Sequence, residues 1–116
     1  MSTVVVSTEK IGEKLRHIRE EKKLPLRKVA ALIDIDVAIL SKMERGERKI
    51  TKEVVLKLAE IYDYNANDLL VLFLSDKILY EIQGEDLGIE ALKVAEERAK
   101  YINANVGKKS KKTDTF

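Results

Sequence analysis

The chain has 116 residues and a formal net charge of +2; 45% of the residues are apolar and 36% are charged. It has one histidine and no cysteine, which excludes disulfides, thiolate metal sites and any paired-imidazole site. No apolar run approaches the roughly 20 residues that cross a bilayer, so we expect a soluble, cytoplasmic protein of one domain or one small domain with an appendage.

The first predicted helix begins near Ile11. Ile11, Leu15 and Ile18 recur at i, i+4 and i+7, so one stripe of this helix faces a core while the charged residues between them face water. Ser7 or Thr8 is expected to cap the helix by accepting a hydrogen bond from a free backbone amide.

Two short helices follow. Pro25 ends the preceding segment and suits the first turn of a second helix, from Leu26 to about Ile33. The sequence Asp34-Ile35-Asp36 predicts a tight turn, with Asp36 as the N-cap of a third helix. Gly46 is placed to end that third helix in a left-handed conformation.

The rest of the chain is also predicted to be helical. Thr51 caps a fourth helix and Asn65 a fifth, which is expected to continue through Ile82. A break between Gly84 and Gly88 precedes a sixth helix. The inward stripe predicted for the fourth helix is Val55, Leu58, Ala59 and Tyr62. The third helix runs through Leu40 and Met43, and the fifth carries Leu69, Leu70, Phe73 and Leu74. The fold class is therefore all-α.

Two short helices joined by a three-to-four-residue turn and flanked by other helices describe a helix-turn-helix. At this point the sequence resembles the Cro/phage-repressor type, also called the xenobiotic-response-element family, most specifically in Leu-Ser-Lys-Met-Glu-Arg-Gly-Glu-Arg at residues 40–48. The resemblance covers about Ile11 to Leu70. It implies a five-helix repressor-like domain, followed here by an additional C-terminal helix, and a transcriptional regulator that binds double-stranded DNA.

The resemblance places the third helix, about residues 37–45, in the major groove. The base-facing positions that it implies are Val37, Ala38, Ser41 and Lys42. Lys42 can donate to guanine O6/N7 or to a phosphate, but the family usually has polar or amide residues where Val37 and Ala38 stand. We therefore predict specificity that depends on thymine methyl contacts and on DNA shape. The alternative is that Val37 and Ile39 pack inside the protein.

The resemblance also implies phosphate contacts at the start of the second helix and in the loop after the third. The usual amide-bearing residue at the first of these positions is Leu26 here, and Arg27 and Lys28 beside it can supply charge instead. The loop cations are Arg45, Arg48 and Lys49. A solvated surface cation is the alternative for each of these five residues.

Arg19 and Glu44 have a structural role by the same resemblance. They are expected to meet as an ion pair that holds the third helix at its angle to the first, and neither is placed among the base readers. His17 is expected to be exposed. The paired acids at turns, such as Asp34 and Asp36, are explained by helix capping without catalysis.

Charge is unevenly distributed along the chain. Residues 9–50 hold 12 Lys/Arg and 8 Asp/Glu, residues 51–106 hold 6 and 11, and residues 107–116 hold 4 and 1. We divide the chain into an N-terminal arm (1–8), a DNA-binding domain (9–74), a helical extension (75–106) and a disordered basic tail (107–116). Apolar stripes on the fifth and sixth helices predict a homodimer that binds an inverted repeat. The alternative is a hairpin that folds back on a monomer.

The sequence points away from catalysis. It has no phosphate-cradling glycine loop and no nucleophile pattern, so we expect no enzyme activity, no cofactor, no metal and no small-molecule ligand. A regulator of this size resembles restriction–modification controller proteins, phage-type repressors and antitoxins, which the sequence does not separate. The rival function is a protein–protein interaction module that uses the same fold without specific DNA readout.

Overall fold

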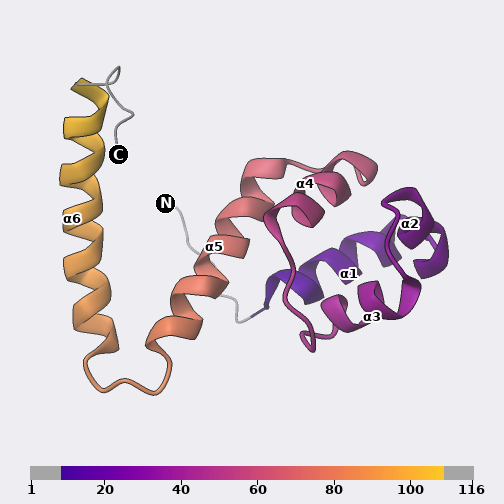
Figure 1. Cartoon of the computed structure of the whole chain (residues 1–116), viewed down its shortest axis with the longest axis horizontal. Coiled ribbons are helices and arrows are strands. Elements are labelled where there is room, and N and C mark those ends of the chain that lie inside the picture. Colours follow the sequence, from indigo (N-terminus) through magenta and orange to yellow (C-terminus); the bar gives the residue numbers. More distant parts are fainter. Residues whose placement is uncertain (1–8, 109–116) are drawn as a thin grey trace. The chain divides into compact units, whose positions relative to one another are not determined.

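The computed structural model describes residues 9–108, which form six helices and no strand (Figure 1). This confirms the all-α prediction. The helices are α1 (Ile11–Glu21), α2 (Leu26–Leu32), α3 (Val37–Glu44), α4 (Lys52–Ile61), α5 (Ala66–Ile82) and α6 (Gly88–Lys108). The chain divides into two compact units, and the division between Ile78 and Leu79 falls within α5. The predicted arm 1–8 and residues 109–116 of the predicted tail lie outside the described residues.

The core of the first unit is built from the inner faces of α1 to α5. It consists of Ile11, Leu15, Ile18, Val29, Ala30, Ile33, Leu40, Met43, Val54, Val55, Leu58, Ala59, Tyr62, Leu69 and Phe73. The inward stripes predicted for α1 and α4 are confirmed. Of the apolar residues that α5 carries, Leu69 and Phe73 are buried, whereas Leu74 is more than half exposed. Apolar residues surround α5, so periodicity alone does not select one face.

The N-caps of α3, α4 and α5 are those that the sequence predicts. The side chains of Asp36 and Thr51 accept hydrogen bonds from the backbone N–H groups of Ala38 (2.8 Å) and Val54 (3.2 Å). Asn65 accepts from the N–H of Asp68 at 3.0 Å. Each cap satisfies an amide that has no partner within its helix, which fixes where the helix begins.

The start of α1 differs from the prediction. Its N-cap is Lys10, not Ser7 or Thr8. The backbone N–H of Lys10 donates to the Glu13 carboxylate at 3.1 Å, and the N–H of Ile11 donates to the carboxylate of Asp76 at 2.8 Å. Asp76 lies on α5, so a tertiary contact does what a local cap was expected to do.

A turn follows the C-terminus of α2, and a loop follows the C-terminus of α3. Asp34 follows α2 with a φ of +58°, and the Asp34 and Ile35 N–H groups donate to the carbonyls of Ala31 and Ala30. Gly46 follows α3 with a φ of +78°, and the Glu47 N–H donates back to the Lys42 carbonyl at 2.8 Å. This Schellman geometry confirms the predicted glycine stop after α3.

The second unit contains the end of α5, a turn and α6. Gly84 has a φ of +83°, and the predicted break between Gly84 and Gly88 is confirmed. Because α6 runs to Lys108, the helix includes the first two residues of the predicted tail. Among the helices of the described part of the chain, none combines the length and the apolar character that a membrane span requires.

Candidate nucleic-acid interface

The recognition candidate is α3, which packs against both α1 and α2 (Figure 1). Its inner side buries Leu40, Met43 and Glu44. Since these residues hold α3 to the core, its opposite side faces outward. The eight residues of α3 therefore present a fixed outer face at the end of a short, capped helix.

The predicted base-facing residues lie on that outer face. Val37 is 42% exposed, and Ala38 and Lys42 are also exposed, whereas Ser41 is half-buried. The alternative that Val37 packs inside the protein is wrong. Ile39, in contrast, does pack against the core. The outer face is thus mostly apolar, and its one formal charge is that of Lys42.

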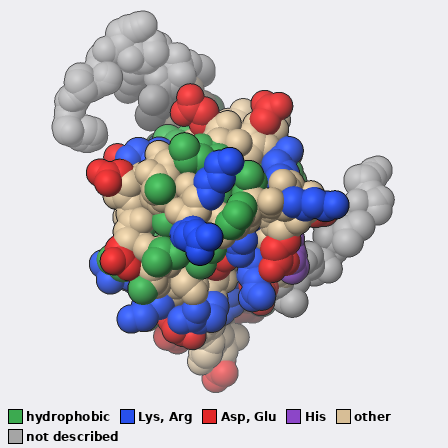
Figure 2. Space-filling model, turned by 90° about the vertical axis from the view of Figure 1, so that its right-hand side faces the viewer, with side chains coloured by type: hydrophobic (Ala, Val, Ile, Leu, Met, Phe, Trp, Pro, Cys, Tyr) green, Lys and Arg blue, Asp and Glu red, His purple; other side chains and the backbone are tan. Residues whose placement is uncertain are grey.

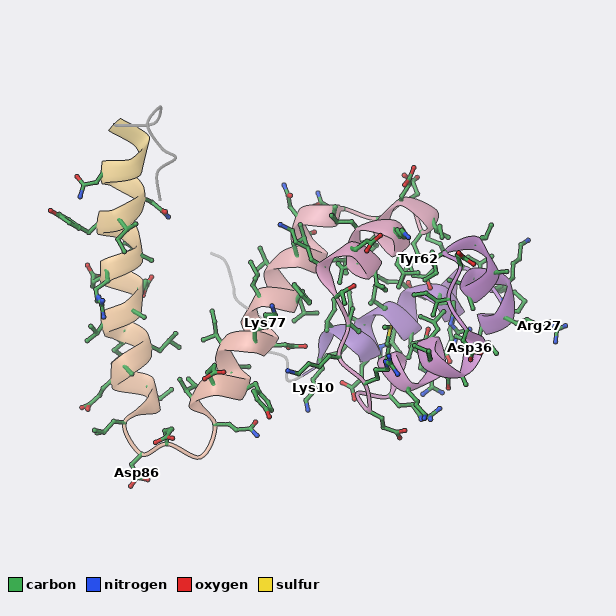
Figure 3. The ribbon with its side chains drawn as sticks, viewed as in Figure 1. Lys10, Arg27, Asp36, Tyr62, Lys77 and Asp86 are labelled. Carbon is green, nitrogen blue, oxygen red and sulfur yellow. The ribbon has the colours of Figure 1, made fainter. Side chains whose placement is uncertain are left out.

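The five predicted phosphate-facing cations are all exposed and lie on two segments that adjoin α3. Arg27 and Lys28 are on α2, and Arg45, Arg48 and Lys49 are at or just after the end of α3. Figure 3 shows Arg27 extending outward from the unit. Figure 2, viewed from the side of α2, shows apolar side chains lying among Lys and Arg side chains. A basic surface of this kind suits a polyanion.

Arg45 is engaged within the protein. Its Nε and Nη2 donate to the two carboxylate oxygens of Glu47 at 3.1 and 3.0 Å, and its Nη1 donates to the Ser41 hydroxyl. The hydrogen bond to Glu47 raises the pKa of Arg45 and lowers the pKa of Glu47. A phosphate would therefore compete with Glu47 for this guanidinium.

Arg19 and Glu44 form the ion pair that joins α1 to α3. The Arg19 Nε and Nη2 donate to the Glu44 carboxylate at 2.8 and 3.0 Å, and the Arg19 Nη1 donates to the Leu24 carbonyl at 2.9 Å. The Glu44 side chain is only 4% exposed, and its hydrogen bonds raise the pKa of Arg19. One guanidinium thus fixes the end of α3 and the loop before α2.

Comparison with known proteins agrees with this geometry. The helix-turn-helix family model matches residues 15–69, which run from within α1 to the first turn of α5. Residues 15–69 form a helix-turn-helix domain. This confirms the resemblance to the Cro/phage-repressor type.

One relative carries a functional name. The chain is 38% identical over 61 residues to the HTH-type transcriptional regulator DdrOP3 of Deinococcus deserti. The aligned part is 53% of this chain and 47% of that protein. The chain therefore spans about half the length of the curated relative that it matches.

Gly12 supports the helix-turn-helix domain in a way that the sequence did not reveal. A Cβ atom at this position would lie 2.4 Å from the Met43 carbonyl oxygen and 2.9 Å from that of Glu44. Only a residue without a Cβ lets α1 approach the end of α3 this closely. Gly12 and the Arg19–Glu44 pair therefore fix the same end of α3.

Other titratable groups of the helix-turn-helix domain do not form a site. His17 is exposed, as predicted, and its Nδ1 faces the Glu9 carboxylate. Within residues 9–108, no group of three or more His, Cys, Asp or Glu residues is arranged to hold a metal ion.

The domain buries one tyrosine hydroxyl that has no hydrogen-bond partner among the described residues, that of Tyr62. Burial raises the pKa of Tyr62, and the carboxylate of Glu44 contributes in the same direction. We expect Tyr62→Phe to raise the free energy of unfolding by about 1 kcal/mol, because it removes a buried donor without a partner. Urea unfolding followed by circular dichroism measures this. Tyr101→Phe, at an exposed position, is the control, and a destabilised Tyr62→Phe variant would contradict the assignment.

Proposed function

We propose that this protein is a sequence-specific transcriptional regulator that binds double-stranded DNA with α3 in the major groove. The observation that carries the proposal is the exposed outer face of α3, which has cations on the segments beside it. On its inner side, the buried Arg19–Glu44 pair holds α3 to α1. The helix-turn-helix match and the name of the Deinococcus relative support it. Such a role places the protein in the cytoplasm and needs no catalytic group.

The proposal assigns the contacts with DNA to two sets of residues. Phosphate contacts position the protein, and base contacts specify the site. The base set is Val37, Ala38, Ser41 and Lys42, and the phosphate set is Arg27, Lys28, Arg45, Arg48 and Lys49. Arg19 and Glu44 position α3 and contact no DNA.

Selection of bound sequences from a random duplex pool tests the function. We expect enrichment of one motif, and affinity for it that falls with salt by about 0.9 in the log–log slope for each phosphate neutralised. Absence of binding at about 50 mM salt with micromolar protein would overturn the proposal. That result would favour the protein-interaction module, in which apolar Val37, Ala38 and Ile39 contact a protein.

The proposal includes a homodimer formed through residues 75–106. Ile102 of α6 is more than half exposed, and so is Leu79 near the end of α5. Leu92, Ala95, Ala99 and Ile102 follow one another at steps of three, four and three, the spacing of a helix–helix seam. Exposed apolar groups of this extent indicate an interaction site, and a second copy offers the same complementary seam. A two-fold dimer would bind an inverted repeat.

The dimer predicts the effect of a charge in the seam. We expect Ile102→Asp to be monomeric in sedimentation and to bind the selected inverted repeat at least an order of magnitude more weakly, because each half-site then binds alone. Asn67→Asp adds the same charge at an exposed position of α5 outside residues 75–106 and is the control. An Ile102→Asp protein that stays dimeric would refute this interface.

Glu47 is predicted to limit DNA affinity. In Glu47→Gln the Arg45 guanidinium loses its charged partner, so a phosphate competes only with neutral acceptors, among them the Ser41 hydroxyl. We expect affinity to rise severalfold at low salt, with the log–log salt slope steeper by about 0.9. Glu60→Gln on α4 removes the same charge elsewhere and should change neither quantity. Unchanged affinity and slope in Glu47→Gln would show that Arg45 does not contact the backbone.

A further inference from the structure

The outer face of α3 offers few hydrogen-bonding groups to a base. The Asp36 carboxylate accepts the Ala38 N–H at 2.8 Å, so it is engaged as the helix cap. The Ser41 hydroxyl accepts a hydrogen bond from Arg45, and the Ser41 side chain is half-buried. Ser41 and Lys42 both stand about one turn away from the start of the helix. The first turn of α3 therefore meets its surroundings through Val37 and Ala38.

The neighbouring helix α2 also exposes an apolar side chain. Leu32 at the end of α2 is 58% exposed, close in sequence to Val37 across the turn. Cations border these residues on both sides along the chain, with Arg27 and Lys28 before them and Lys42 after them. A protein partner with an apolar surface would not interact favourably with these cations. A DNA duplex would, because its phosphates flank a groove in which thymine presents an apolar methyl group.

We propose that Val37 and Ala38 read the 5-methyl group of pyrimidines, so that 5-methylcytosine replaces thymine at the positions they contact. This inference rests on the proposed function and adds to it the chemistry by which the base is chosen. Thymine and 5-methylcytosine carry the same methyl group in the major groove but opposite hydrogen-bonding groups at C4. A polar side chain that hydrogen-bonds to the group at C4 distinguishes the two bases, whereas an apolar side chain that contacts the methyl group does not.

The test uses the motif selected from the random pool, with one position changed at a time. Replacing a contacted thymine by deoxyuracil deletes only the methyl group, and we expect a loss of about fourfold in affinity, the effect of burying one methyl-sized group. Replacing the same A·T pair by G·C should cost at least as much. Methylating that cytosine at C5 should then restore affinity to within twofold of thymine.

The protein side of the test is Val37→Asn, which replaces both methyl groups of the side chain by a polar amide. We expect this variant to lose the difference between thymine and deoxyuracil at the position that Val37 contacts, while it still binds duplex DNA. Leu56→Ala is the matched control, since Leu56 is 41% exposed but lies on α4. It should retain the full difference.

The outcomes separate this inference from the proposed function. Failure to select any motif overturns the proposed function itself. A selected motif that tolerates deoxyuracil at every position, or in which 5-methylcytosine does not restore binding, overturns methyl reading and leaves DNA binding in place. A Val37→Asn protein that still distinguishes thymine from deoxyuracil at every position overturns the assignment of methyl reading to Val37.

Discussion

Glu44→Ala is expected to lower the free energy of unfolding by about 3–5 kcal/mol, the cost of leaving a buried charge without its partner. The Arg19 side chain is 12% exposed and directs two of its nitrogens at Glu44. Without the carboxylate, only the hydrogen bond from Nη1 to the Leu24 carbonyl remains. Urea unfolding followed by circular dichroism gives the change in stability.

The same substitution is expected to weaken DNA binding even where the protein remains folded. Glu44 is the last residue of α3, and its pair with Arg19 ties that end of the helix to α1. Measuring affinity at low temperature separates misplacement of α3 from unfolding.

Two further variants make this prediction specific. Glu53→Ala breaks the exposed pair with Lys57 and should cost less than about 0.5 kcal/mol. Replacing both Arg19 and Glu44 by Met and Leu removes both charges and should recover most of the stability, because a buried pair is often matched by apolar groups of similar volume. A folded Glu44→Ala protein of unchanged stability would refute the structural role of the pair.

Local features of the sequence were sufficient to predict where most helices begin and end. Asp36, Thr51 and Asn65 cap helices through bonds to amides two or three residues away, and Gly46 ends α3 through bonds within one turn. Such contacts depend on neighbours in the chain, so residue type and spacing reveal them. The Arg19–Glu44 pair came from the family resemblance, since 25 residues separate its members.

Contacts between distant segments could not be predicted in this way. The carboxylate of Asp76 caps α1 across 65 residues of sequence. Neither Ser7 nor Thr8 signals that contact. The exposure of Leu74 depends on which side of an evenly apolar α5 meets the core. The pairing of Arg45 with Glu47 depends on side-chain conformations that two exposed charges do not fix from sequence alone.

Two opposing effects determine the stability of the Gly12→Ala variant. Alanine is favoured over glycine in helices, by up to about 1 kcal/mol in an interior and by less in the first turn of α1, where Gly12 lies, so helix propensity alone predicts a more stable protein. The close approach to α3 predicts the reverse, because the new Cβ would meet the Met43 carbonyl oxygen at 2.4 Å. Backbone atoms cannot move aside as a flexible side chain can. Since overpacking costs about 3 kcal/mol in such a position, we expect a net destabilisation of about 2 kcal/mol.

The control for this prediction is Gly46→Ala. Gly46 has a φ of +78° and open space around a built Cβ, so alanine there costs about 1 kcal/mol through its backbone conformation and displaces nothing. Gly12→Ala must push α1 and α3 apart, whereas Gly46→Ala leaves them in contact. We therefore expect Gly12→Ala, unlike Gly46→Ala, to weaken DNA binding by more than the fraction of unfolded protein in the sample explains. A Gly12→Ala protein that is as stable as the parent and binds DNA with unchanged affinity would contradict this prediction. It would show that α1 and α3 can separate without moving the outer face of α3.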